Sequence, residues 1–490
     1  MKHEDAKDEN KDNSALYSEN WPFDLDLLPL SAFMVGGAVR DALLGRRREY
    51  LDLDFVLPNG AVETASAIAN HYKAGFVLLD RDREIARVVF KNATADFARQ
   101  EGNSLEKDLH RRDYTINAIA YNPRTQEIID PLQGYADLQA GVIRMVSSAN
   151  LADDPLRLLR GYRQAAQLGF AIEPQTRSTM RQLAPLLGNM AAERVRVELN
   201  YLLNSPQGTP WLSAAWEDGI LEWVLHDNLT AANLALLAEI DRAYVRLAEK
   251  WPQLAEYLLS NIPGLAEGAK RTWIAIAKLA CLLIPQGPPN PPNLGGTNFS
   301  DSPNLGGNQL FSATTPNVGG HGGEISDVLE QKVSGNDRLE IRLNYTRAGI
   351  SVQNSTIEDF LKQITYSLPE IRAINTIIKF LPQMRSPSMS LRSQYFFFRE
   401  VGVVFPALAV VAVATGTKVE DLAYLSDHYL NPNDQVAHPT PLVTGNDLIA
   451  SLNLKPSPKI GQLLIEIQIA RIEGKISTPT EAINFASQLL

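Results

Sequence analysis

The chain has 490 residues, of which 45% are hydrophobic, and this length exceeds what one hydrophobic core usually organises, so we expect several domains. Its formal net charge of −10 neither indicates nor excludes a nucleic-acid partner, because the charge of a whole chain can hide a local basic cleft. A single cysteine, Cys281, excludes an intramolecular disulfide framework and a cysteine-based zinc cluster, and no uncharged apolar run reaches the roughly 18 residues of a membrane span.

The N-terminal segment MKHEDAKDENKDNSALYSEN is charged and lacks the apolar centre of a secretory signal. We expect residues 1–30 to form a disordered charged tail. The single cysteine fits a reducing, cytoplasmic location, and no membrane partner is expected.

Residues 31–146 mix strand-like and helical patterns, which indicates an α+β head. Apolar runs predict strands at 51–57, 76–79, 85–90, 94–97 and 141–146, and helical patterns are found near 61–73 and 113–120.

The stretch FMVGGAVRDALLGRRREYLDLDFV, residues 33–56, predicts a strand, a glycine turn, a short helix and a second strand. Asp52 and Asp54 are two apart in that second strand and therefore point to the same face, where two carboxylates suit Mg²⁺. Gly36 and Gly37 let backbone N–H groups approach a phosphate at the start of the helix. A phosphate cradle beside metal carboxylates predicts phosphoryl or nucleotidyl transfer.

Asp96, in ATADFAR, is a third candidate carboxylate on a neighbouring strand. Three carboxylates could hold two Mg²⁺ ions, one for the attacking hydroxyl and one for the leaving pyrophosphate. The alternative is an aspartate at a strand edge without a catalytic role.

The segment HRRDYTINAIAYNP, residues 110–123, carries a second group of candidates. Arg111 and Arg112 could neutralise a triphosphate, while Asp113 and Asn117, four apart on a predicted helix, could hold ribose hydroxyls or a loop. The alternative is a helix cap followed by solvated arginines.

The segment DDPLRLLRGYR, residues 153–163, carries the third group. Asp154 and Arg157 at i and i+3 would set an acceptor beside a donor on one helix face, which fits the Watson–Crick edges of C and A and rejects U and G. Arg160 and Arg163 could reach phosphates. An ordinary intrahelical salt bridge is the alternative.

Beyond residue 146 the apolar periodicity is helical. The repeats PNLGG, PNLGG and PNVGG lie in a Pro/Gly/Asn-rich stretch that cannot bury enough apolar surface to order itself. A segment of helix, glycine-containing turn and helix at 441–476 could present N–H groups to an RNA backbone, or could be an ordinary helical cap. We expect helical segments that we name the neck (147–210), the body (211–285 and 326–430) and the tail (431–490), with a flexible insertion at 286–325.

The motifs GGAVRD, LDLDFV, RRDYTINAIAY, DDPLRLLRGYR and AAERVRVEL, in this order, resemble the class II tRNA nucleotidyltransferases, the CCA-adding enzymes and their bacterial poly(A) polymerase relatives. The resemblance implies a polymerase-β-like nucleotidyltransferase head followed by an all-α neck, body and tail that grip the acceptor and T arms of tRNA. It also implies Mg²⁺ as cofactor and nucleoside triphosphates as substrates.

The resemblance assigns roles to particular residues of this chain. It implies a metal role for Asp52 and Asp54. It implies nucleotide contacts for Gly37, Arg40, Arg112, Asp154, Arg157, Arg160 and Arg163, and a neck-packing role for Glu193, Arg194 and Glu198.

Three features depart from the family pattern. Asp153 replaces the usual Glu before Asp154, and the seven histidines form no His-Asp motif of a phosphohydrolase domain. Only FARQEGNSLEKDLH separates Asp96 from Arg111, where complete CCA-adding relatives often carry a longer flexible loop. This short connection favours an enzyme that adds only the two cytidines, beside a separate A-adding enzyme.

We therefore expect a tRNA nucleotidyltransferase that adds C from CTP, with addition of the terminal A from ATP left open. The alternatives are a poly(A) polymerase and an inactive RNA-binding relative. Two adjacent aspartates without an evident partner weigh against the inactive relative.

Overall fold

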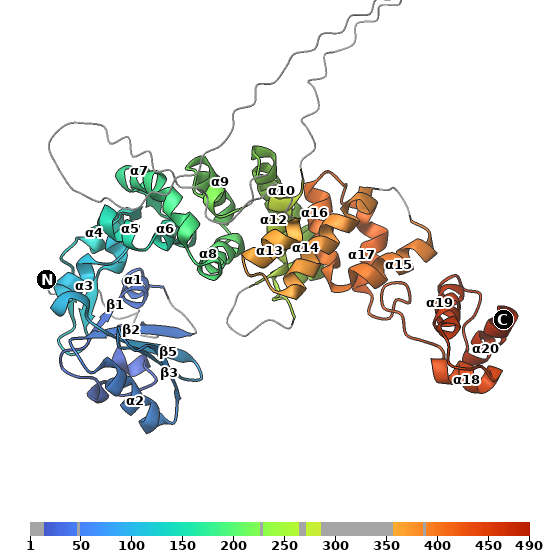
Figure 1. Cartoon of the computed structure of the whole chain (residues 1–490), viewed down its shortest axis with the longest axis horizontal. Coiled ribbons are helices and arrows are strands. Elements are labelled where there is room, and N and C mark those ends of the chain that lie inside the picture. Colours follow the sequence, from blue (N-terminus) through green and yellow to red (C-terminus); the bar gives the residue numbers. More distant parts are fainter. Residues whose placement is uncertain (1–13, 47–49, 226–228, 264–270, 286–355, 386–388) are drawn as a thin grey trace, which may run out of the picture. The chain divides into compact units, whose positions relative to one another are not determined.

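The structure is a computed structural model that describes residues 14–46, 50–225, 229–263, 271–285, 356–385 and 389–490. Strands occur only in the N-terminal part of these ranges, and helices follow (Figure 1). This arrangement confirms the predicted α+β class with an all-α remainder. The expected insertion at 286–325 and the start of the second body segment lie outside the described residues.

The head contains a seven-stranded sheet in the order β3-β4-β5-β2-β1-β6-β7. Its strands are β1 (Phe33–Val35), β2 (Leu51–Leu57), β3 (Gly75–Asp80), β4 (Ile85–Val89), β5 (Ala93–Arg99), β6 (Ala120–Asn122) and β7 (Glu127–Ile129). The central strands β2 and β5 are parallel, and every other pairing in this sheet is antiparallel. The strands predicted at β2 to β5 are confirmed.

One face of the sheet packs against the N-terminal segment and α2 (Ala61–Tyr72). Phe55 of β2 stacks on Phe97 of β5 with ring centroids 5.4 Å apart, and the Trp21 and Phe23 rings pack against Phe55. The expectation of a disordered tail is therefore wrong from Ser14 onward, because these two aromatic rings bury themselves on the sheet. The charged residues 1–13 lie outside the described residues.

The predicted helix at 113–120 is also wrong. The chain makes a single 3₁₀ turn at Thr115–Asn117 and then continues as β6, which pairs with β1. Asp113 and Asn117 still approach each other, but across this turn. Farther along, the expected strand at 141–146 is reduced to β8 (Val142–Ile143), which pairs in parallel with β9 (Ala171–Ile172).

The other α-helices include those beyond residue 146, which follow the predicted helical periodicity. In the head and neck they are α1 (Gly37–Leu43), α3 (Leu105–His110), α4 (Gly134–Ala140), α5 (Ser148–Asp153), α6 (Leu156–Leu168), α7 (Pro174–Leu183) and α8 (Ala192–Asn204). Beyond residue 204 they are α9 (Gly208–Glu217), α10 (Ala231–Lys250), α11 (Pro252–Leu259), α12 (Trp273–Leu283), α13 (Ile357–Gln363), α14 (Leu368–Phe380), α15 (Leu391–Val401), α16 (Phe405–Ala414), α17 (Ala423–Leu430), α18 (Gly445–Leu452), α19 (Pro458–Ile472) and α20 (Pro479–Gln488).

Two wholly buried helices, α12 and α16, form the centre of the body. The stretch Leu391–Ala414 is long and apolar enough to cross a membrane by composition, but 72% of its most apolar window is buried inside the protein. Gly402, with φ +48°, also separates α15 from α16. This stretch therefore belongs to the hydrophobic core, because a membrane span would expose its apolar side chains to lipid.

The last three helices have a core of their own, which includes Val443, Leu448, Ile460 and Ala482. The predicted pair of helices is confirmed as α18 and α19. The expected glycine in the turn is wrong, because Asn453 supplies the left-handed residue after α18 with φ +49°.

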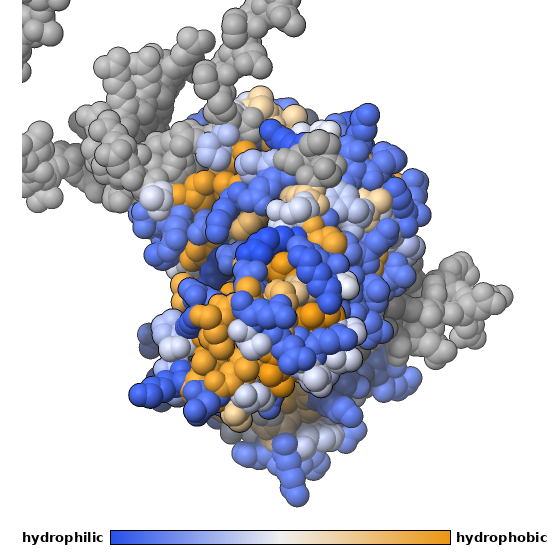
Figure 2. All heavy atoms as spheres, turned by 90° about the vertical axis from the view of Figure 1, so that its right-hand side faces the viewer, coloured by the Kyte–Doolittle hydropathy of each residue, from blue (hydrophilic) through white to orange (hydrophobic). Residues whose placement is uncertain are grey.

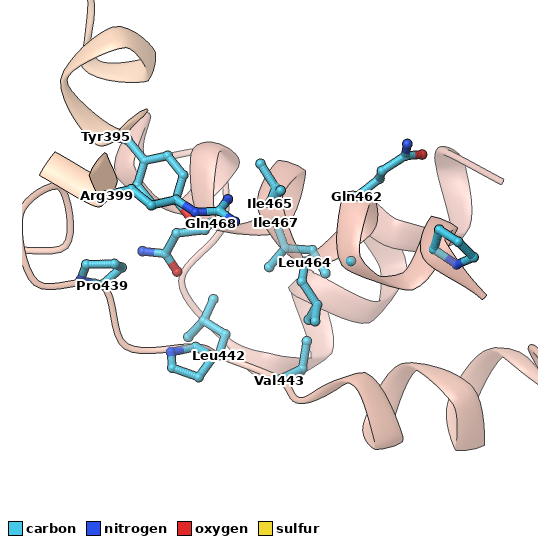
Figure 3. A pocket seen from close by; sticks show the side chains of 13 residues that line it. Tyr395, Arg399, Pro439, Leu442, Val443, Gln462, Leu464, Ile465, Ile467 and Gln468 are labelled. Carbon is cyan, nitrogen blue, oxygen red and sulfur yellow. The ribbon is translucent and has the colours of Figure 1, made fainter. Parts of the chain in front are cut away.

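An open groove lies where α19 faces α15, and apolar side chains gather on this side of the molecule (Figure 2). Tyr395 and Arg399 come from α15, whereas Leu464, Ile465 and Gln468 come from α19 (Figure 3). The groove contains none of the candidate catalytic residues.

The buried thiol of Cys281 gives a test of this core. Cys281 is 0% exposed in α12, and burial raises its pKa to about 12. Because the thiolate is the reactive form, we expect no labelling by a thiol reagent at pH 8 in native buffer and complete labelling in guanidinium chloride. Rapid stoichiometric labelling of the native protein would contradict the buried position of α12.

Candidate active site

The three predicted carboxylates meet on one face of the sheet. In the parallel pairing of β2 with β5, Asp54 lies opposite Asp96, and Asp52 lies opposite Thr94. Since side chains alternate along a strand, all of these point away from the aromatic core. The sequence prediction that Asp52, Asp54 and Asp96 come together is confirmed.

Two neighbouring side chains orient these carboxylates. Thr94 Oγ1 donates a 2.7 Å hydrogen bond to Asp52 Oδ1. Arg87 of β4 donates to both oxygens of Asp96, at 2.7 and 2.8 Å. Sequence reasoning missed Arg87, although its position between Ala86 and Val88, which are buried on the other face, could have indicated it. Asp96 is thus neutralised by an arginine, while Asp52 and Asp54 have no such bidentate partner among the described residues.

Within this cluster of carboxylates, the pKa of Asp54 is strongly raised. Burial, followed by the charges of Asp52 and Asp96, raises the pKa of Asp54 to about 7, and Arg112 and Arg87 only partly offset this. A divalent cation would relieve the repulsion, and oxygen ligands suit Mg²⁺. No group of three or more His, Cys, Asp or Glu side chains in the described part of the chain surrounds a common metal position. Because Arg87 already pairs with Asp96, Asp52 and Asp54 are the two carboxylates that could hold such an ion.

The glycine turn lies beside these carboxylates. Gly36 has φ +73°, and a Cβ atom there would lie 3.3 Å from both Asp54 Oδ2 and Arg112 Nη1. The backbone angle favours glycine, and a Cβ atom would be in tight contact with both side chains. The next residue, Gly37, is the first of α1, so the predicted order of strand, glycine turn and short helix is confirmed.

The predicted triphosphate arginines have acidic neighbours. Arg112 donates to Asp108 Oδ2 at 2.9 Å, and Arg111 lies 3.2 Å from Glu101 on the surface. Asp108 Oδ1 also accepts from the backbone N–H of Glu101. The short connection between β5 and Arg111 is therefore folded, with α3 and this aspartate fixing it against Arg112.

Asp113 and Asn117 lie inside the head rather than on an open helix face. Asn117 Nδ2 donates to Asp113 Oδ1 at 2.9 Å, and Arg160 lies 3.2 Å from Asp113 Oδ2. Burial alone would raise the pKa of Asp113, but Arg160 and the hydrogen bonds from Asn117 and the Tyr114 backbone hold it below its usual value.

The predicted helix face shared by Asp154 and Arg157 is wrong. Helix α5 ends at Asp153, and α6 begins after Pro155, so Asp154 lies in the break with φ −135°. A residue before proline is pushed out of the helical region, which is the physical reason.

The two residues consequently have separate partners. Asp154 Oδ2 accepts from Arg194 Nη2 of α8 at 2.9 Å, whereas Asp154 Oδ1 is buried without a hydrogen-bond partner. Arg157 Nη1 donates to the backbone carbonyls of Arg111 and Asn150, at 2.9 and 3.0 Å. The intrahelical salt bridge between Asp154 and Arg157 is therefore not formed. The orphan carboxylate oxygen remains an acceptor for a ligand.

Helix α8 also contacts Arg163 of α6. Glu198 accepts from Arg163 Nε at 2.5 Å, and the Arg163 guanidinium lies 5.6 Å from the centre of the Tyr201 ring. Arg160 and Arg163 are thus held by carboxylates, Asp113 and Glu198, rather than extending freely toward phosphates. Arg194 and Glu198 contact the segment 153–163. The mostly exposed side chain of Glu193 instead lies 3.7 Å from Arg196.

Comparisons with known proteins agree with this geometry. Three family models match the chain. The model of the poly A polymerase head domain matches residues 32–144, and that of the RNA and SrmB-binding site of polymerase A matches residues 169–230. The model of tRNA nucleotidyltransferase domain 2 matches residues 347–486. A CC-adding tRNA nucleotidyltransferase of Synechocystis sp. is 45% identical over 473 residues, which is 96% of each chain. An A-adding tRNA nucleotidyltransferase of Deinococcus radiodurans is 29% identical, over 94% of this chain and 96% of that one.

Solved structures show the same fold. A CCA-adding enzyme in its apo form I has a TM-score of 0.60 at 18% identity, covering 94% of this chain and 90% of that one. The Thermotoga maritima CCA-adding enzyme complexed with tRNA has a TM-score of 0.59 at 19% identity, covering 94% and 91%. The motifs, the sheet with its carboxylates and the full-length identity together lead to one conclusion: the chain belongs to the tRNA nucleotidyltransferase family.

Proposed function

We propose that this chain adds cytidines to the 3′ end of tRNA from CTP without a nucleic-acid template and stops after the second. The observation that carries the proposal is its full-length likeness to the Synechocystis CC-adding protein. The folded connection between Asp96 and Arg111 supports it, because α3 and Asp108 fill the place where a longer flexible loop would lie.

In the proposed reaction the tRNA 3′-hydroxyl attacks the α-phosphate of CTP, and pyrophosphate leaves. Asp52 and Asp54 would hold Mg²⁺, which when bound lowers the pKa of the attacking hydroxyl and neutralises charge on the phosphates. Thr94 keeps Asp52 oriented through its 2.7 Å hydrogen bond. The N–H groups at Gly37, together with Arg112, would seat the triphosphate.

Base choice would rest on Asp154 and Arg157. Cytosine offers an amino donor beside a ring-nitrogen acceptor, and uracil offers the reverse. The unpartnered Asp154 Oδ1 can accept from the amino group, and the remaining N–H groups of Arg157 can donate to the ring nitrogen. Arg194 would hold the acceptor in place from the other side.

Neither a poly(A) polymerase nor an inactive RNA-binding relative is favoured, since the full-length relatives are named for nucleotide addition to tRNA. Addition of the terminal A by this chain is not part of the proposal, and a separate A-adding enzyme would complete the tRNA. We propose a cytoplasmic enzyme that grips the acceptor and T arms of tRNA through its neck (147–210), body (211–285 and 326–430) and tail (431–490).

Product length tests the function. Purified protein with Mg²⁺ and a tRNA that ends at the discriminator base should extend it by two residues with CTP alone. The product should not lengthen further when ATP is added. A three-residue product with both nucleotides would make this a complete CCA-adding enzyme, and long A tracts would make it a poly(A) polymerase.

Replacing Asp54 by Asn should lower C incorporation by about a hundredfold or more, because one of the two metal carboxylates is lost. Binding of tRNA, measured by gel shift, should stay within about twofold. The matched control is Asp82→Asn, which alters an exposed aspartate in the turn between β3 and β4. Retained activity in Asp54→Asn would remove Asp54 from the metal site.

The same variant has a predicted effect on stability. Because the folded-state pKa of Asp54 is raised to about 7 from its ordinary value of 3.8, the metal-free fold loses stability as the pH rises from about 4 to 7, and the loss is complete above 7. In EDTA at pH 8.5, Asp54→Asn should therefore be more stable than the parent, by about 1–3 kcal/mol after allowance for partial exposure. The gain should shrink at pH 5. A gain that is equal at both pH values would show that charge repulsion is not its cause.

Replacing Arg157 by Ala should relax the choice of base. The kcat/KM ratio of CTP to UTP should fall by roughly tenfold or more, because the donor to the ring nitrogen is lost. Arg242→Ala, on the exposed side of α10, is the control and should leave the ratio unchanged. An unaltered ratio in Arg157→Ala would remove this residue from base reading.

A further inference from the structure

A chain of buried hydrogen bonds runs from the glycine turn to the base-reading helix. Arg40 of α1 donates through Nη1 to Asn117 Oδ1 at 2.7 Å. Asn117 Nδ2 donates to Gln164 Oε1 of α6 at 2.9 Å and also to Asp113 Oδ1 at 2.9 Å. Gln164 and Asn117 are 2% and 6% exposed, so water competes little for these bonds.

The amide of Asn117 has only one arrangement that satisfies this environment. Its two N–H groups face two acceptors, Asp113 and Gln164, and its oxygen faces the Arg40 guanidinium. Turning the amide over would set its oxygen against a carboxylate and its NH₂ group against a cation. The three bonds therefore form as a set and fix the side chain.

The Arg40 end of this series of hydrogen bonds lies at the glycine turn. The backbone N–H of Arg40 donates to the carbonyl of Gly36, so Arg40 belongs to the first turn of α1. A Cβ atom on Gly37 would lie 3.6 Å from Arg40 Nη2. The Arg40 guanidinium therefore lies beside the backbone of this turn.

The other end lies on the helix that carries the base-reading arginine. Gln164 is seven residues, or about two turns, beyond Arg157 on α6, so the two share a helix face. Three other contacts hold α6 to the segment 111–114, namely Arg157 to the Arg111 carbonyl, the Tyr114 hydroxyl to the Arg157 carbonyl, and Arg160 to Asp113. The first two do not continue to the glycine turn. Gln164 reaches it because its oxygen accepts directly from Asn117, whereas Arg160 reaches Asn117 only through Asp113.

We propose that Gln164 is a positioning residue that couples the seat of the triphosphate to the orientation of the base-reading helix, and so sharpens the choice of CTP over UTP. This inference rests on the proposed function, because it assigns the phosphates to the glycine turn and the base to Asp154 and Arg157. Gln164 touches neither part of the nucleotide in this assignment. It acts through Asn117 and Arg40.

The test is Gln164→Met, which keeps an unbranched side chain of similar length but removes the acceptor for Asn117. The CTP to UTP ratio of kcat/KM should fall roughly tenfold, because a small displacement of α6 misplaces Arg157. General destabilisation would lower the use of both nucleotides together and leave their ratio unchanged. The ratio therefore separates a positioning role from a structural one.

Two further variants complete the experiment. Gln164→Glu retains an acceptor oxygen in either protonation state and should keep the ratio within about threefold of the parent. Gln182→Met makes the same substitution at an exposed site on α7 and should change nothing. If the Asn117 link carries the effect, Asn117→Leu combined with Gln164→Met should lose no more selectivity than Asn117→Leu alone.

An unchanged ratio in Gln164→Met, or additive losses in the double variant, would overturn the coupling. The proposed function fails by a different result, namely no C incorporation by the parent protein. In that case equilibrium binding of CTP and UTP to the parent and to Gln164→Met still measures the selectivity. Equal selectivity of the two proteins in binding would overturn the coupling there as well.

Discussion

The parallel pairing of β2 with β5 is the constraint on which the rest of the site depends. It sets Asp54 directly opposite Asp96 and brings Asp52 to the same face, so three carboxylates crowd one surface of the sheet. The protein neutralises one of them with Arg87 and leaves Asp54 with a raised pKa. The remaining repulsion between the carboxylates is unfavourable, and a bound divalent cation would relieve it.

In the neck, by contrast, arginines are numerous, and they pair with carboxylates. Asp113 holds Arg160, and Glu198 holds Arg163, so each guanidinium has a fixed direction before any ligand binds. Asp154 is the exception, because Arg194 uses one of its oxygens and the other stays buried and unpaired. A buried acceptor without a donor is costly in a folded protein, and a ligand amino group would remove that cost.

Local chemistry explains which parts of this arrangement could be predicted from the sequence. The alternation of Asp52 and Asp54 and the glycine turn were readable because strand period and positive φ are local properties. The helix predicted at 113–120 failed because β6 is stabilised by pairing with β1, some 85 residues earlier, a non-local contact with no signal in the segment itself. The break at Asp154 was readable and was missed, since Pro155 disfavours a helical residue before it. Arg194 and Gln164 act through tertiary contacts, which spacing alone cannot indicate, whereas the alternation along β4 could have indicated the face on which Arg87 lies.

The hydrogen bonds that fix the connection after β5 and helix α6 bear on the choice of nucleotide. An enzyme that accepts C and then A at one site must rearrange its base-reading residues between the two steps, and such a rearrangement needs a mobile element. Here Asp108 holds the connection after β5 against Arg112, and Asn117 joins the glycine turn to α6. Each bond that stabilises the site in one arrangement raises the free energy of any second one. A site fixed in this way suits the repeated addition of a single base, which is the physical reason that a short connection and a cytidine-only product belong together.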